Sequence, residues 1–130
     1  MTRRIAQVAI LVPDYDEAIA HYTGDLGFKL LDDIPLGAEK RWVVVAPSAS
    51  AGVRLLLAKA DGKRQRARIG DQTGGRVFLF LETDDLAADY QRMRERGIRF
   101  SEEPRSESYG LVAVFEDRYG NRWDLIEPRG

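Results

Sequence analysis

Two short stretches, "VPDYDEA" at residues 12–18 and "TDDLAAD" at residues 83–89, decide the fold of this chain. Each stretch follows an apolar run and places an acid, Asp14 or Asp85, where a helix is expected to begin. An acidic side chain there accepts hydrogen bonds from backbone N–H groups of the first helical turn, which have no partner within the helix. Asp85 follows Asp14 by 71 residues, so the same local signal occurs once in each half of the chain.

The similarity between the halves extends beyond these two helix starts. "LGFKL" at 26–30 matches "RGIRF" at 96–100, and "VRLLLA" at 53–58 matches "NRWDLI" at 121–126. The offsets differ by only a few residues, as small differences in loop length would produce. Because the match uses the whole chain, we interpret it as an internal duplication.

Each half is predicted to contain a strand, an acid-capped helix, a glycine and three further strands. Alternating and apolar runs place the strands at 4–13, 28–34, 41–47, 53–60, 75–83, 98–104, 109–117 and 121–128. The helical stripes expected to be buried are Ala18, Ile19, Tyr22 and Leu26 in the first half and Leu86, Tyr90 and Met93 in the second. Glycines are expected to end these helices, Gly24 or Gly27 in the first half and Gly97 in the second.

Composition predicts one soluble domain over residues 1–130, with module one at 1–60, a basic linker at 61–73 and module two at 74–130. The linker sequence "GKRQRAR" is interpreted as a solvated loop. A net charge of −1 argues against nucleic-acid or membrane partners. The chain has no cysteine, which excludes disulfides and thiolate chemistry. No signal peptide or membrane span is evident, so a cytoplasmic location is expected.

The paired modules carry "AIAHYTGDLGF" at 18–28, "LETDDL" at 81–86 and "DRYGNRWDLIEP" at 117–128. In their order and spacing these motifs resemble the vicinal oxygen chelate superfamily, which includes glyoxalase I, extradiol dioxygenases and the fosfomycin- and bleomycin-resistance proteins. The resemblance implies an α+β, glyoxalase-like fold. In that fold two βαβββ modules form an eight-stranded, cup-shaped open barrel with helices outside. It also implies a homodimer.

In that superfamily a divalent metal often sits in the cup, held by histidines and glutamates on the first and last strands of each module. The corresponding positions here hold Gln7, Leu56, Phe78 and Asp124. Catalytic metal sites generally need three or more nitrogen or oxygen ligands, and the side chains of Leu56 and Phe78 offer none. We therefore predict no metal and no cofactor. The only histidine, His21, is predicted to be a partly exposed helix residue without a catalytic role.

Strand alternation predicts which side chains line the cup. Arg122, Asp124 and Ile126 are expected to face inward, with Trp123 and Leu125 turned toward the helix. The predicted ligand-binding residues are Gln7, Trp42, Arg54, Leu56, Phe78, Phe80, Tyr109, Arg122 and Asp124.

Several of these residues have a second interpretation. The two arginines either clamp a carboxylate or phosphate of a ligand, or pair with Asp124 or Glu82 so that no charge is buried alone. Trp42 and Tyr109 fit a pocket rim, the protein core or a dimer contact equally well.

Three functions compete. The favoured one is a protein that binds a small organic molecule in its cup without a catalytic metal. The alternative is an enzyme, either a metal-dependent lyase, isomerase or dioxygenase of the glyoxalase type or a metal-free enzyme with Asp124 as base. The third is a non-catalytic scaffold whose cup is packed shut by Leu56, Phe78 and Phe80. Whether the chain is an enzyme at all is left open by the sequence.

Overall fold

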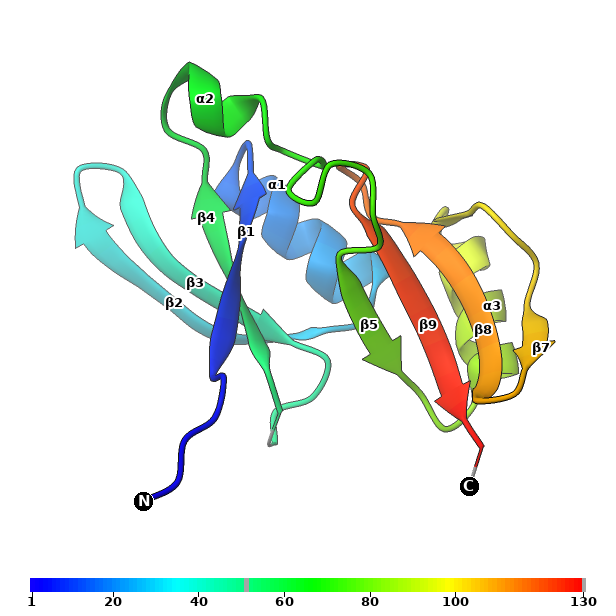
Figure 1. The fold of residues 1–130 in the computed structure, drawn as a ribbon. Helices are drawn as coiled ribbons and strands as arrows, with labels where there is room; N and C mark the ends of the chain where they lie inside the picture. The colour runs from blue at the N-terminus through cyan, green and yellow to red at the C-terminus, as the bar shows by residue number, and fades with distance from the viewer. Residues whose placement is uncertain (51, 130) are drawn as a thin grey trace. The chain divides into compact units, whose positions relative to one another are not determined.

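The computed structural model describes residues 1–50 and 52–129. It consists of two compact units, Met1–Ile69 and Gly70–Gly130, each built around one β-sheet (Figure 1). The boundary falls within the predicted linker. The grouping of both modules into a single domain stays a prediction.

The first unit contains four strands in the order β1-β4-β3-β2. These strands are β1 (Gln7–Val12), β2 (Lys29–Gly37), β3 (Lys40–Ala46) and β4 (Arg54–Lys59). β1 and β4 are parallel, whereas the β2–β3 and β3–β4 pairs are antiparallel. The helix α1 (Tyr15–Ala20) connects β1 to β2 and continues into a π-helical turn, η1 (His21–Asp25).

The second unit repeats this topology. Its elements are β5 (Leu79–Glu82), α3 (Leu86–Glu95), β6 (Arg99–Phe100), β7 (Arg105–Glu107), β8 (Gly110–Glu116) and β9 (Arg122–Pro128). The strand order β5-β9-β8-β6 matches that of the first sheet, with a parallel β5–β9 pair in place of β1–β4.

One predicted strand of the second unit is wrong. The single strand expected at residues 98–104 is instead two short strands, β6 and β7, which both pair with β8. Residues 101–104 between them lie outside the ladder and end at Pro104. Proline has no backbone N–H to donate to a neighbouring strand, so it does not continue the pairing.

Both acid-capped helix starts are confirmed. The Asp14 carboxylate accepts a hydrogen bond from the backbone N–H of Glu17 at 2.8 Å. Asp85 accepts one from the N–H of Ala88 at 3.2 Å. The glycine ends are confirmed at Gly27 and Gly97, which have φ of 74° and 86°, whereas Gly24 lies inside η1.

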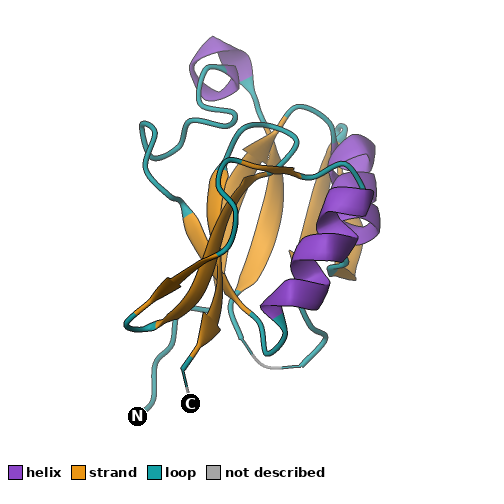
Figure 2. Ribbon diagram, turned by 90° about the vertical axis from the view of Figure 1, so that its right-hand side faces the viewer, coloured by secondary structure: helices purple, strands orange, loops and turns teal. Residues whose placement is uncertain are grey.

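In each unit the helix covers one face of the sheet, and the core lies between them (Figure 2). The core of the first unit includes Ile10, Val12, Ala18, Tyr22, Leu55 and Leu57, and that of the second includes Leu86, Met93, Ala113, Phe115, Trp123 and Leu125. Of the predicted stripes, Ala18, Tyr22, Leu86 and Met93 are buried, whereas Ile19, Leu26 and Tyr90 are only half-buried.

The linker prediction is corrected by a short helix, α2 (Gly62–Arg66), in place of a continuous loop. The side chain of Gln65 accepts a hydrogen bond from the N–H of Asp61 at 2.8 Å and so closes its first turn. None of the α2 side chains is buried, so the basic residues face solvent as expected. Throughout the described residues, no helix has the length and apolar character that a bilayer crossing requires.

Candidate functional site

Each sheet has a second face that its helix leaves uncovered, here called the free face. In the first unit the parallel register sets Gln7 opposite Arg54 and Ala9 opposite Leu56. Residues paired across neighbouring strands project to the same face, so these side chains all lie on the free face. Leu55 and Leu57 alternate with them and are buried on the helix side. Gln7, Arg54 and Leu56 thus point away from the helix, as alternation predicts, and their place in a cup stays a prediction.

Trp42 belongs to the same free face. Val44 is paired with Leu56, and alternation along β3 places Trp42 on the side of Val44. Ile34 of β2 lies opposite Trp42 in the antiparallel register. Trp42 is 36% exposed and Ile34 is 48% exposed, so together they form an apolar surface rather than part of the core.

The free face of the second unit is centred on Asp124. The register of β9 sets Asp124 between Phe80 of β5 and Val114 of β8. Its neighbours Trp123 and Leu125 are buried on the helix side, as alternation predicts. Phe80 is 64% exposed, so this face offers a carboxylate beside an accessible aromatic ring.

Two other predicted residues of the second unit, Phe78 and Tyr109, lie outside the strands that flank Asp124. Phe78 precedes β5, where its N–H donates to the carbonyl of Arg122 at 2.8 Å. Tyr109 lies in the turn before β8 and is 53% exposed. Both therefore remain available as the margins of a binding surface.

The predicted pairing of Arg122 with Asp124 or Glu82 is wrong. The guanidinium of Arg122 instead donates to the backbone carbonyl of Gly75 at 3.3 Å. Within the described residues no hydrogen bond or ion pair engages the Asp124 carboxylate.

Desolvation between apolar neighbours raises the pKa of Asp124, and the positive charges of Arg105 and Arg122 oppose that rise. Of these two charges Arg105 has the larger effect on the Asp124 pKa, yet its guanidinium pairs with other acids. Its guanidinium contacts Glu102 at 2.7 Å and Glu107 at 2.8 Å. Asp124 is therefore a carboxylate without its own counter-ion.

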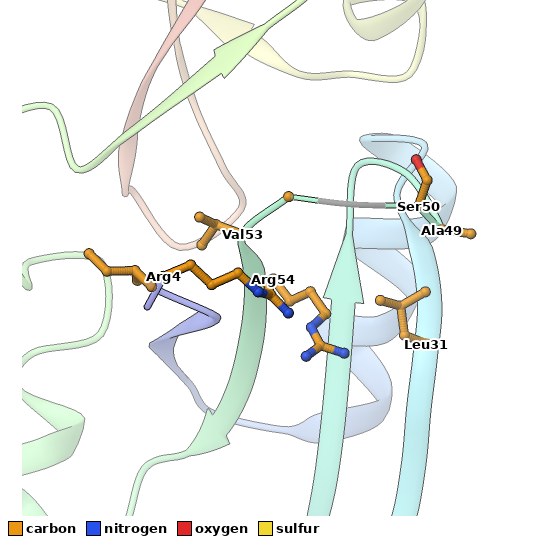
Figure 3. A pocket seen from close by; sticks show the side chains of 8 residues that line it. Arg4, Leu31, Ala49, Ser50, Val53 and Arg54 are labelled. Atoms are coloured by element: carbon orange, nitrogen blue, oxygen red, sulfur yellow. The ribbon is translucent and has the colours of Figure 1, made fainter. Parts of the chain in front are cut away.

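A pocket at one end of the first sheet was not predicted. It encloses about 740 Å³ and is lined by Arg4, Ile5, Leu31, Ala49, Ser50, Gly52, Val53 and Arg54 (Figure 3). Of these residues only Arg54 was a predicted site residue. The others come from the segment before β1, from β2 and from the β3–β4 connection, which alternation within one strand does not bring together.

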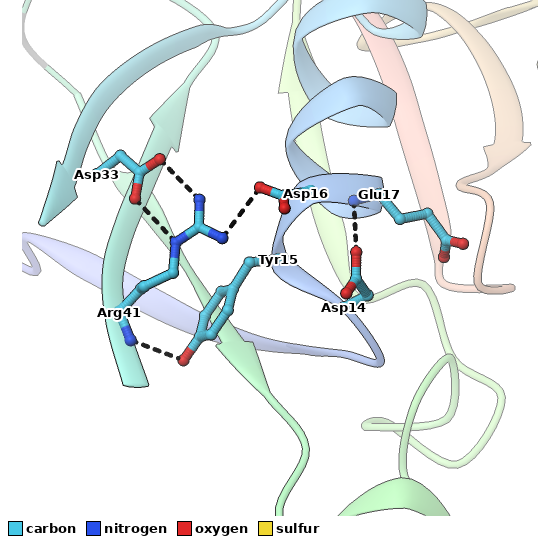
Figure 4. Close-up of polar contacts among 6 residues, drawn as sticks. All are labelled: Asp14, Tyr15, Asp16, Glu17, Asp33 and Arg41. Atoms are coloured by element: carbon cyan, nitrogen blue, oxygen red, sulfur yellow. Dashed lines mark hydrogen bonds and ion pairs between the residues drawn. The ribbon is translucent and has the colours of Figure 1, made fainter. Parts of the chain in front are cut away.

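Arg41 anchors the β2–β3 hairpin to α1 (Figure 4). Its guanidinium binds both carboxylate oxygens of Asp33, at 3.1 and 2.8 Å, and one oxygen of Asp16 at 3.0 Å. It also lies 5.1 Å from the ring centroid of Tyr15, whose hydroxyl accepts from the Arg41 N–H at 3.2 Å. The hydrogen bonds from Arg41 lower the pKa of Asp33. These contacts hold Trp42, the next residue, in position.

His21 is buried, with only 5% exposure, so the prediction of a partly exposed side chain is wrong. Its Nδ1 lies 2.9 Å from a carboxylate oxygen of Asp25. This partner within η1 satisfies Nδ1 of the ring, and a polar group can be buried when it is hydrogen-bonded. His21 packs against Tyr22 on the helix side of the unit, away from the free face.

Comparison with known proteins identifies the family. The model of the Glyoxalase/Bleomycin resistance protein/Dioxygenase superfamily matches residues 4–125. The chain belongs to this superfamily. An uncharacterized protein of Shewanella frigidimarina is 52% identical over 98% of this chain and 95% of its own length.

Two solved structures show the same fold. UcmS2 is 33% identical with a TM-score of 0.84, covering 98% of this chain and 99% of its own. TnmS3, an antibiotic-binding protein from a Streptomyces species, is 31% identical with a TM-score of 0.78, covering 98% of each chain. The predicted glyoxalase-like α+β fold is therefore confirmed. The cup that would join the two sheets stays a prediction.

The metal positions of the superfamily do not fit a metal ion in this chain. By the correspondence predicted from the sequence, Gln7 and Leu56 take two of them in the first unit, and Phe78 and Asp124 take two in the second. Leu56 and Phe78 have hydrocarbon side chains, so at most two oxygen ligands remain, fewer than a catalytic site generally needs. Among residues 1–50 and 52–129, no three His, Asp or Glu side chains gather in a way that would hold a metal.

Proposed function

We propose that this chain binds a small organic molecule on the free faces of its strands and that binding requires no catalytic metal. The observation that carries the proposal is the exposure of Trp42 and Phe80 on the faces where the superfamily places metal ligands. The similarity to the antibiotic-binding protein TnmS3 supports it. The proposed contact residues are Gln7, Trp42, Arg54 and Leu56 in the first unit and Phe78, Phe80, Tyr109, Arg122 and Asp124 in the second.

The chemistry of these faces favours a ligand with flat, apolar rings. Exposed aromatic side chains offer large, rigid surfaces for stacking, and ring pairs contribute about 0.5–1.5 kcal/mol beyond their buried area. Polar groups beside the rings, Gln7 and Arg54 on the first face and Asp124 on the second, would fix the orientation of a ligand on their own face. Such a mixture is typical of small-molecule sites.

The two tryptophans provide the test. Trp42 is 36% exposed on the free face, whereas Trp123 is 3% exposed in the core. Titration with a panel of polycyclic aromatic antibiotics is expected to quench the fluorescence of Trp42. The Trp123→Phe variant should keep that response, and the Trp42→Phe variant should lose it. A panel that neither quenches Trp42 nor raises the melting temperature would refute the proposal.

The metal-independent part of the proposal is tested separately. Binding should be unchanged after treatment with EDTA, and elemental analysis should find no stoichiometric nickel, zinc, manganese or iron. A stoichiometric metal whose removal abolishes binding would instead support a metal-dependent enzyme of the glyoxalase type.

A second candidate function is metal-free proton abstraction by Asp124. The raised pKa of this carboxyl and its lack of a counter-ion favour it, because a desolvated carboxylate is a stronger base. The test is deuterium exchange, followed by NMR, at a C–H next to a carbonyl in a bound ligand. Asp124→Asn should abolish the exchange, and unchanged exchange in this variant would exclude the role.

We also infer a homodimer, as the superfamily resemblance implies, and a cytoplasmic location. Ile34, Leu36 and Trp42 expose apolar surface on the β2–β3 hairpin, which suits a contact with a second copy. Light scattering coupled to size-exclusion chromatography should give twice the mass of 14.7 kDa. A monomer at all concentrations would contradict the inference.

A further inference from the structure

The pocket in the first unit places two arginines at the same end of the sheet. Arg54 begins β4, and its backbone N–H donates to the carbonyl of Ala6 at 3.0 Å. Arg4 precedes Ala6 by two residues on the segment that leads into β1. Because β1 and β4 run parallel, both side chains arrive where these strands start. Figure 3 shows them extending from the two neighbouring segments into the space bordered by Leu31.

Neither guanidinium is neutralised by the chain. Across residues 1–50 and 52–129, no ion pair or side-chain hydrogen bond engages Arg4 or Arg54. Arg41 in the same unit shows the contrast, because it binds two carboxylates. Two like charges that share a pocket repel each other, and an anion bound between them removes that cost. Because the net charge is only −1, this positive site is a local feature.

The rest of the pocket is suited to a hydrocarbon group. Ile5 is 73% exposed and Val53 is 46% exposed, while Leu31 and Ala49 border the opposite side. Ser50 adds one hydroxyl at the rim, where it also hydrogen-bonds the hydroxyl of Ser48 at 2.7 Å. A volume of about 740 Å³ is large enough for a drug-sized molecule.

We propose that this pocket recognises an amphipathic organic anion, with a carboxylate, sulfonate or phosphate bound by Arg4 and Arg54. The adjoining apolar part of the molecule contacts Ile5, Val53 and Leu31. Guanidinium groups suit this role because their planar donors form paired, charge-assisted hydrogen bonds with such oxyanions. The inference rests on the proposed binding function, since Arg54 shares the free face with Gln7 and Leu56. It adds the chemical class of the ligand and a contact residue, Arg4.

The test compares two dyes that differ by one anionic group. These are 8-anilinonaphthalene-1-sulfonate and its neutral parent N-phenyl-1-naphthylamine, both of which fluoresce more strongly in apolar sites. The wild-type protein should bind the sulfonate about tenfold more tightly than the neutral dye. Arg4→Gln and Arg54→Gln should each remove about tenfold of the sulfonate affinity while changing that of the neutral dye by less than about twofold.

Arg3→Gln is the matched control. It removes the same charge from the same segment, but Arg3 does not line the pocket, so sulfonate binding should stay near the wild-type value. Arg4→Lys and Arg54→Lys retain the charge and should recover part of the loss. Circular dichroism establishes that each variant is folded before its affinity is compared.

The outcomes separate this inference from the proposed function. Equal affinity for the two dyes, or an equal loss in Arg3→Gln, would overturn the arginine site and leave binding of small molecules intact. If inorganic phosphate displaces the sulfonate dye as readily as octanoate does, the proposed contact with an apolar part of the ligand is overturned. A site that binds only the anionic group would then explain the result. Failure of both dyes and of the antibiotic panel would overturn the binding function itself.

Discussion

The two units share one strand order, yet their free faces differ in charge and in chemistry. Arg54 in the first unit corresponds to Arg122 in the second, and Leu56 corresponds to Asp124. Arg54 opens onto a pocket, whereas Arg122 is tied to a backbone carbonyl. Among the described residues, Arg54 therefore lacks an acid partner on the first face, and Asp124 lacks a cation partner on the second.

On the helix side of the same strands, the side chains differ much less between the two units. Leu55 and Leu57 correspond to Trp123 and Leu125, and all four are buried. A close-packed core tolerates mainly apolar replacements of suitable volume, whereas a face outside the core is free to change its chemistry. The difference between the units teaches that the duplicated fold was kept by its core, while the side chains of its free faces diverged in charge and polarity.

The largest difference between the units is expected when a glycine is replaced by alanine in the hairpin turn before β3 or before β8. The quantity compared is the loss in the free energy of unfolding. A Cβ at Gly110, which has φ of 150°, would lie 2.3 Å from the carbonyl oxygen of Glu127. We expect Gly110→Ala to lower the free energy of unfolding by roughly 4 kcal/mol, because backbone must move. Gly37 has φ of 88° and nothing within 4 Å of its Cβ position, so Gly37→Ala should cost only about 1 kcal/mol. Urea unfolding measures both, and similar costs would contradict the contrast.

The next largest effect tests whether core and free face are separate within one strand. Leu57 is fully buried, so Leu57→Ala should lower the free energy of unfolding by about 3 kcal/mol. Leu56 is half-buried on the free face, and Leu56→Ala should cost less than about 1.5 kcal/mol. Its effect should appear instead as weaker ligand binding. Equal losses of stability would mean that Leu56 is packed as tightly as the core.

Removing Arg41 should alter the acid dependence of stability. Arg41 lowers the pKa of Asp33, so this contribution is present above the unfolded value near 3.8 and is lost as pH falls through the lowered pKa. Arg41→Gln should be less stable than the wild type at pH 7, and the two should converge at low pH. Arg3→Gln, which removes an exposed charge elsewhere, should run parallel to the wild type. A constant difference between Arg41→Gln and the wild type at every pH would contradict the ion pair.

The smallest expected change in stability is that of Asp124→Asn. It should stabilise the protein, whereas Arg41→Gln should destabilise it. The raised pKa of Asp124 means that the fold favours the protonated form, so stability is lost as pH rises above the unfolded pKa near 3.8. Asp124→Asn should therefore increase the free energy of unfolding at pH 7 by at most about 0.5 kcal/mol, and the difference should vanish near pH 3. Asp84→Asn serves as an exposed control. A less stable Asp124→Asn protein would show that attraction by Arg105 and Arg122 outweighs desolvation.

The repeat and the faces of its strands were predictable because they depend on local patterns. Alternation in "VRLLLA" and "NRWDLI" places Leu57 and Leu125 under helices and Asp124 on the free face, as the structure confirms. The acids Asp14 and Asp85 marked both helix starts for an equally local reason.

Features that depend on distant partners were missed. The contact of Arg122 with the Gly75 carbonyl joins residues 47 positions apart, and no pattern in either segment indicates it. The pocket combines Arg4 with residues of the β3–β4 connection. These segments lie side by side because β1 and β4 pair in parallel, and this pairing could not be predicted from either segment alone. The partner of buried His21 is Asp25, four residues later, so the sequence did contain a hint of this contact. The hint is weak because pairs with this spacing are also common on exposed helices.

The irregular form of β2 has a consequence for the behaviour of the protein at high concentration. β2 is the last strand in its sheet order, and its register against β3 shifts twice, between Leu30 and Asp32 and between Pro35 and Gly37. A long, regular outer strand is a template for pairing with other molecules, but bulges, charges and proline all interrupt such pairing. β2 combines the three, with Asp32 and Asp33 between the shifts. The first sheet is therefore protected against growing into intermolecular β-aggregates along this edge.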